Sequence, residues 1–309
     1  IASGDCTDFG IGSENSIGLP NVAFDGTNYL VVFMKGAIIR GTRVSQSGTV
    51  LDGPSGFAIS TGQLFSITNT FPAVAFDGAN YLVVWWKFIP IAGVGTRNVF
   101  GARVTPAGQV LGEIPISAEQ NTSDQLGFTF DLGAPSLAFD GTNYLVVWNK
   151  VRTGPGSSAY STLFAPYTDV SGTRITPQGA VLDPQGILLS TAGPFFQSPP
   201  AENVQVAFDG TNYLAVWRKA LTIGFDPPPA EIRGTRIRPD GTLLDGPASG
   251  GGIGISTIVL SKSEPVVVFD GTNFLVAWVV GAFSPPVGMF GAKVSPGGQV
   301  VEGLPTTTG

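Results

Sequence analysis

The chain has 309 residues, of which 43% are hydrophobic and only 12% are charged, and its formal net charge is −6. The negative charge argues against a nucleic-acid partner, because binding to a phosphate backbone needs a basic surface. The absence of histidine excludes Ser-His-Asp and Cys-His catalysis and imidazole metal sites. No metal or cofactor is predicted, and no apolar run is long enough to span a membrane.

Residues 1–19 precede the first repeated motif. We expect them to form an N-terminal strap that closes the fold, or to be the remnant of a preceding repeat. They contain the single cysteine, Cys6, which has no partner for an internal disulfide. Cys6 is either a buried, idle thiol or an intermolecular thiol that bonds to another chain. No signal peptide is visible, so we expect a mature, processed chain.

An eleven-residue motif, AFDGTNYLVVW at Ala138, has near-copies that begin at Ala23, Ala75, Ala207 and Val268. A second motif of the type GTRVTPxGxVLD follows each copy, and most units close with an apolar tail that ends in serine. Self-similarity at this period indicates a repeat architecture. The whole chain, 1–309, is therefore predicted to be one domain of five units. Their bounds are about 20–61, 72–118, 135–191, 204–257 and 265–309.

Each unit is predicted to form four short strands. In the first unit these cover residues 21–24, 29–33 and 41–44, and a fourth strand begins at 50–52 and includes the tail. The runs are β-branched and aromatic and are bounded by Gly, Pro, Asn and Asp, with no helical period. The DGTN between the first two strands is a tight hairpin loop, in which Asp caps the turn. A Pro-containing turn joins the third strand to the fourth.

The second strand of each unit is apolar at every position, so it must be covered on both faces. Four-stranded sheets packed around an axis provide this cover. Proline precedes the first strand in four units, at Pro20, Pro72, Pro135 and Pro265, which suits an innermost strand at a sheet edge. The sequence therefore predicts an all-β, five-bladed β-propeller of four-stranded antiparallel blades. A stacked solenoid is the alternative.

The connections between strands should emerge on two faces of the propeller. One face carries the uniform DGTN and Pro-Gly turns, whereas the other carries connections that vary in length and are rich in aromatic residues and proline. Variable insertions on one face often mark a binding surface, although these aromatics could equally fold over and bury one another. The candidate binding residues on this variable face are Lys35, Lys87, Phe88, Lys150, Tyr160, Phe164, Tyr167, Lys219, Phe225 and Phe283.

Three sets of repeated residues are interpreted as structural. One acidic set caps the hairpin turns in preference to binding metal: Asp25, Asp77, Asp140, Asp209 and Asp270. One aromatic set packs between blades in preference to stacking on sugars: Phe33, Trp85, Trp148, Trp217 and Trp278. One basic set pairs with a neighbouring aromatic ring or turn carboxylate: Arg43, Arg103, Arg174, Arg236 and Lys293.

No catalytic constellation is evident, so no catalytic residue is predicted. A glycosidase needs two carboxyl groups on either side of the scissile bond. The carboxylates that could pair in this way are Glu113, Asp169, Asp226, Glu231 and Glu264. Nothing in the sequence indicates which two of them converge.

The repeat VAFDGTNYLVVW, followed by GTRVTPxGxVLD, resembles one found in large secreted and surface proteins of bacteria, and the five-bladed form is similar in architecture to tachylectin-type lectins. The resemblance covers nearly the whole chain and implies a propeller that is secreted or displayed at the cell surface. We therefore expect a non-enzymatic extracellular module that binds or assembles through its variable face. Its partner would be a protein, a glycan, or further copies of the chain in a homo-oligomer or filament. A carbohydrate-binding lectin is the alternative, and a glycosidase-type hydrolase ranks last.

Overall fold

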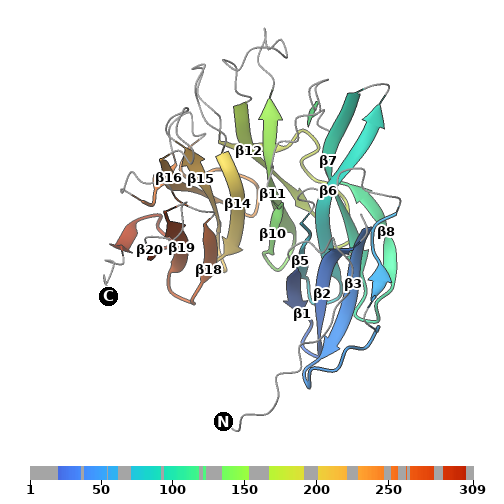
Figure 1. The fold of residues 1–309 in the computed structure, drawn as a ribbon. Helices are drawn as coiled ribbons and strands as arrows, with labels where there is room; N and C mark the ends of the chain where they lie inside the picture. The colour runs from blue at the N-terminus through green and yellow to red at the C-terminus, as the bar shows by residue number, and fades with distance from the viewer. Residues whose placement is uncertain are drawn as a thin grey trace.

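The computed structural model describes residues 20–35, 38–53, 55–61, 71–91, 94–117, 121–122, 134–152, 167–190, 201–220, 229–246, 252–256, 262, 265–281 and 288–303. These residues form five antiparallel sheets that follow one another along the chain. Figure 1 shows the sheets side by side in an arc, from blue at the N-terminus to red at the C-terminus. The prediction of an all-β, five-bladed propeller is confirmed. In the described residues no helix is long and apolar enough to cross a membrane.

Each blade has four strands in chain order, and the strand bounds are as follows. Blade 1 contains β1 (Asn21–Phe24), β2 (Asn28–Lys35), β3 (Ile38–Ser45) and β4 (Phe57–Ala58). Blade 2 contains β5 (Ala73–Phe76), β6 (Tyr81–Ile91), β7 (Val94–Val104) and β8 (Val110–Pro115), and β9 (Asn121–Thr122) also pairs with β7. Blade 3 contains β10 (Ser136–Phe139), β11 (Tyr144–Arg152), β12 (Tyr167–Ile175) and β13 (Ile187–Ser190). Blade 4 contains β14 (Ala201–Phe208), β15 (Tyr213–Ala220), β16 (Ala230–Ile237) and β17 (Ile253–Gly254). Blade 5 contains β18 (Val266–Phe269), β19 (Phe274–Val280), β20 (Gly288–Val294) and β21 (Val300–Gly303).

The first strand of each blade is the innermost one. These strands are neighbours in the order β1, β5, β10, β14 and β18, and no comparable contact joins β18 back to β1. Four of them begin directly after a proline, which has no N–H to continue the ladder. Blade 4 has no proline at this position, and its inner strand β14 is correspondingly longer, with Ala201 opposite Lys219.

The fourth strand differs from the prediction in three blades. In blades 1, 3 and 4 the VLD segment makes only an isolated bridge, such as Val44 to Val50, and the fourth strand is formed by the tail. The aspartate of VLD binds an arginine on the third strand instead of continuing the ladder, as Asp52 does with Arg43. In blade 2 glycine replaces this aspartate, and β8 runs without interruption from Val110 to Pro115.

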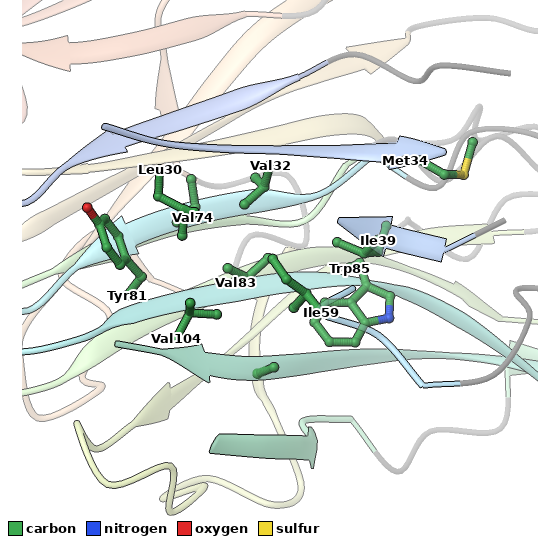
Figure 2. Packing of buried hydrophobic residues seen from close by; sticks show 11 residues of the cluster. Leu30, Val32, Met34, Ile39, Ile59, Val74, Tyr81, Val83, Trp85 and Val104 are labelled. Atoms are coloured by element: carbon green, nitrogen blue, oxygen red, sulfur yellow. The ribbon is translucent and has the colours of Figure 1, made fainter. Parts of the chain in front are cut away.

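Neighbouring blades pack through four apolar clusters, one at each junction. Each blade turns a leading face toward the next blade and a trailing face toward the preceding one. At the first junction, shown in Figure 2, Leu30, Val32 and Met34 of β2 meet Tyr81 and Trp85 of β6. These side chains are almost completely buried, so the second strands of blades 2, 3 and 4 are covered on both faces.

The two terminal blades depart from this pattern, contrary to the expectation that every second strand is covered on both faces. On the trailing face of blade 1, Val22 and Tyr29 are exposed, although Phe33 farther along β2 is buried. In blade 5 the leading face carries Val266 and Val268 of β18 and Met289 of β20, which are exposed, and alternate residues of the second strand β19 are only partly buried. The cause is that the described part of the arc has no blade packed against these two faces.

Two kinds of hydrogen bond recur between neighbouring blades. A tyrosine at the start of the second strand donates to the main-chain carbonyl of the asparagine in the preceding blade's DGTN or DGAN turn, as Tyr81 Oη does to Asn28 O at 3.2 Å. Tyr144 and Tyr213 repeat this bond. An arginine of the third strand reaches forward to a turn carbonyl of the next blade, as Arg236 Nη1 does to Pro296 O at 2.9 Å.

Candidate functional site

The uniform face of the propeller is occupied by structural contacts. Asp25 Oδ1 accepts hydrogen bonds from the main-chain N–H groups of Thr27 and Asn28, both at 2.7 Å. The other four aspartates of the set repeat these bonds. The Gly26 that follows has a φ of 95°, which an L side chain rarely adopts. Each DG pair is therefore used by its own turn.

Three of the repeated arginines form ion pairs with the aspartate of VLD on the same face. The shortest N to O distances are 2.6 Å for Arg43 and Asp52, 2.8 Å for Arg174 and Asp183, and 2.8 Å for Arg236 and Asp245. In blade 2 the aspartate is absent, and the Nε of Arg103 is buried without a partner in the described residues. Burial by itself would raise the pKa of Asp183, but the hydrogen bonds from Arg174 outweigh it and lower this pKa below its ordinary value.

We expect the ion pair of Asp183 to make the free energy of unfolding depend on pH in the acidic range. Because its pKa is lower in the folded state, the stabilisation is complete above the unfolded pKa, near 3.8, and is lost as pH falls through the folded value. Asp183→Asn should lower the free energy of unfolding by roughly 1–3 kcal/mol at pH 7. Urea unfolding of both proteins from pH 7 to pH 2.5 should show this difference shrinking below pH 4. A difference independent of pH would contradict the prediction.

Four of the five aromatic residues that end the second strands lie in the clusters between the blades, and the fifth, Phe33, lies on the trailing face of blade 1. Phe33, Trp85, Trp148, Trp217 and Trp278 are all buried, so they are not available as sugar-stacking platforms. The indole N–H groups of the four tryptophans have no hydrogen-bond partner in the described part of the chain. Their contribution is therefore apolar packing.

The opposite end of the blades carries the variable connections. In blade 2 the connection after Trp85 was predicted to be one of the long variable loops. In the structure β6 and β7 instead continue as a paired hairpin as far as Ile91 and Val94. Phe88 lies in this hairpin, where its main chain is opposite Arg97. In blade 3 Tyr167 is the first residue of β12, opposite Arg152. Regular pairing thus extends into parts of the predicted loops.

The four predicted rim lysines all lie in second strands at this end, and three have described side chains. Lys35 Nζ is 3.5 Å from Ser55 Oγ. Lys87 Nζ is 2.5 Å from Glu113 Oε2 and 4.9 Å from the centre of the Phe100 ring. Lys219 is half-buried, and burial, reinforced by the nearby Arg233, lowers its pKa. The main chain of Lys150 lies opposite Asp169.

Several predicted residues lie outside the described residues. They are the possible intermolecular thiol Cys6, the candidate binding residues Tyr160, Phe164, Phe225 and Phe283, and the carboxylates Asp226 and Glu264. The three remaining carboxylates are described. Glu113 pairs with Lys87 and also accepts a hydrogen bond from the Thr61 N–H of blade 1 at 2.5 Å.

The other two carboxylates occupy equivalent positions in neighbouring blades. Asp169 of β12 and Glu231 of β16 each lie three residues before the glycine of the third strand, opposite Lys150 and Lys219. Asp169 is only 2% exposed. Glu231 is partly exposed and forms an ion pair with Arg233 at 2.8 Å. Since such groups seldom lie buried without a reason, Asp169 is the most unusual carboxylate at this end of the described fold.

Three further polar residues at the same end are buried and were not predicted from the sequence. Asn149 and Arg218 directly follow the tryptophans of β11 and β15, and Lys262 bridges to β19. Arg218 Nε donates to Lys262 O at 2.7 Å, and Lys262 Nζ donates to Ala230 O at 2.5 Å. For Asn149 and Arg218 the sequence did contain a signal, since a polar residue follows the tryptophan of the second strand in blades 3 and 4.

Comparison with known proteins gives matches at the level of structure only. No family model matches the chain, and no curated protein matches it. An exo-1,5-α-L-arabinanase from a bovine ruminal metagenomic library matches with a TM-score of 0.50 at 11% identity, over 93% of this chain and 96% of the other. A Cellvibrio cellulosa α-L-arabinanase complexed with arabinohexaose matches with a TM-score of 0.49 at 10% identity, over 91% and 93%. At these identities the likeness shows the five-bladed fold alone.

This comparison corrects the functional interpretation of the sequence. We expected a non-enzymatic binding or assembly module, but the solved structure that matches nearly the full length of both chains is an exo-arabinanase, which is a glycoside hydrolase. The interpretation as a non-enzymatic module is therefore wrong, and the hydrolase alternative, which ranked last, agrees better with the neighbours.

Proposed function

We propose that this protein is a secreted hydrolase of glycosidase type that cleaves pentose-containing polysaccharides at the variable end of its blades. The observation that carries the proposal is the buried carboxylate of Asp169 at that end of the middle blade. The exo-arabinanase likeness supports it by spanning nearly the full length of both chains. A polysaccharide substrate also agrees with an extracellular location.

Asp169 and Glu231 are the two carboxylates that we assign to the reaction. Hydrolysis of a glycosidic bond needs one group that protonates the leaving oxygen and one that activates water or attacks the sugar. Glu231 is partly exposed and is held in place by the ion pair with Arg233, which suits the base or nucleophile. Asp169 then donates the proton to the leaving oxygen.

The test is a hydrolysis assay on a panel of defined polysaccharides. Arabinan, arabinoxylan and xylan are incubated with the purified protein, with starch as a hexose control, and released sugars are identified by chromatography. We expect sugar release from at least one pentose polymer and none from starch. Binding to these polymers without any cleavage would contradict the enzyme and would favour a lectin.

A further inference from the structure

The strongest unexplained feature is the apolar surface that blades 1 and 5 present at the two ends of the arc. Met289 of β20 is 77% exposed, whereas its counterparts Ile39, Val99, Val170 and Ile232 are each 0% exposed. Val22 of β1 is 56% exposed, whereas its counterpart Val74 is 7% exposed. The position of Met289 is fully buried at all four junctions within the chain, and the position of Val22 is buried or partly buried at each of them. The repeat has therefore kept the chemistry of a junction on faces where no blade is packed.

The two exposed faces are the two halves of the junction that the chain makes four times. Blade 1 presents a trailing face, and blade 5 presents a leading face with Val266, Val268 and Met289. The positions that form the hydrogen bonds between blades also keep polar residues. Tyr29 stands where Tyr81, Tyr144 and Tyr213 donate to the preceding blade, but in the described residues it makes no such bond. Lys293 stands where the four arginines reach forward.

We propose that the space between blades 5 and 1 is the docking site for one further unit of the same repeat. Its leading face packs on Val22 and Tyr29, and its trailing face receives Val266, Val268 and Met289. The asparagine carbonyl of its own DGTN turn accepts the hydrogen bond from Tyr29. The partner is recognised by the chemistry already seen at the four internal junctions, which makes this surface continuous with an established interface.

Insertion of a unit agrees better with the structure than direct closure of blade 5 on blade 1. All four internal junctions are packed to near-complete burial, and close-packed interiors resist deformation. Bringing β18 against β1 would require the junctions to change their geometry together. Insertion of a single unit leaves all four junctions unchanged.

The two methionines of the chain provide a direct test by peroxide oxidation. Met289 is the probe, and Met34, which is 3% exposed, is the internal control. Oxidation of each methionine is followed by mass spectrometry in the full chain and in an extended chain. The extended chain carries a copy of residues 135–190, which form blade 3, ahead of residue 1. A matched control carries the same copy with Leu145→Asp and Val146→Asp, one change on each face.

We expect Met289 to be oxidised quickly in the full chain and about tenfold or more slowly in the extended chain. The matched control should oxidise at the rate of the full chain, and Met34 should react slowly in all three. Three results would overturn the proposal. One is Met289 as protected as Met34 in the full chain at every concentration, which means direct closure. The second is protection only at high protein concentration, which means a second copy. The third is an extended chain no more protected than its control.

Discussion

Replacing Asp169 with asparagine is expected to lower the rate of polysaccharide hydrolysis by about 10²- to 10⁴-fold. This is the usual contribution of a general acid or base that is in place at the reacting bond. The change keeps the size of a side chain that is almost fully buried and one of its two oxygens, but it removes the proton that the side chain can transfer. Initial rates on the polymer that the wild-type protein cleaves, measured across pH 4–8, provide the test.

The control for this experiment is Glu113→Gln. Glu113 lies on the outer strand β8 and is occupied by Lys87 and by the main chain of Thr61, so its loss should leave hydrolysis within about twofold of wild type. Thermal unfolding of both variants separates a catalytic effect from misfolding. An Asp169→Asn protein that is folded and fully active would remove Asp169 from the mechanism.

Truncating Trp217 to alanine is expected to cost about 3–5 kcal/mol of folding free energy. Trp217 is 0% exposed and lies in the cluster between blades 3 and 4 with Val147, Leu189 and Val204. The neighbouring strands are held by their ladders, so the cavity cannot collapse completely. Urea unfolding at constant pH gives the free energy directly, provided that the slope with denaturant is unchanged.

The matched control is Trp217→Phe, because phenylalanine occupies this position naturally at Phe33 of blade 1. The indole N–H of Trp217 makes no hydrogen bond in the described residues, so the exchange loses packing alone. We expect a smaller cost of roughly 1–2 kcal/mol. Equal losses for the two variants would show that the indole contributes more than apolar volume.

The fold could be predicted because each repeat contains residues that mark where its strands begin and end. The DG pairs locate the hairpins, and the prolines before β1, β5, β10 and β18 locate the inner edge. The sequence could not show that the VLD segment lies outside the fourth strand. A β-branched run is typical of a strand, and nothing in it indicates that Asp52 binds Arg43 and does not pair with the third strand. The extent of β6 and β7 was also missed, since Pro90 and the glycines near it are typical of a loop.

The candidate site was less accessible to sequence reasoning than the fold. Asp169 was one of five carboxylates, and its burial depends on residues distant in the chain that the propeller brings around it. The exposure of Met289 and Val22 was hidden for the same reason. A repeat unit has the same sequence pattern whether or not it has a neighbour, so only the arrangement of the blades shows which faces are covered.

The hydrogen bonds between blades have a consequence for how such a chain can change over generations. Tyr81 and Arg236 each use a side chain to contact a main-chain carbonyl of the adjacent unit, Asn28 O and Pro296 O respectively. Every amino acid has a main-chain carbonyl, so the residue that accepts the bond can be substituted without losing it. Whole units can therefore be duplicated, deleted or exchanged by recombination and still fit those beside them, while each acquires its own loops.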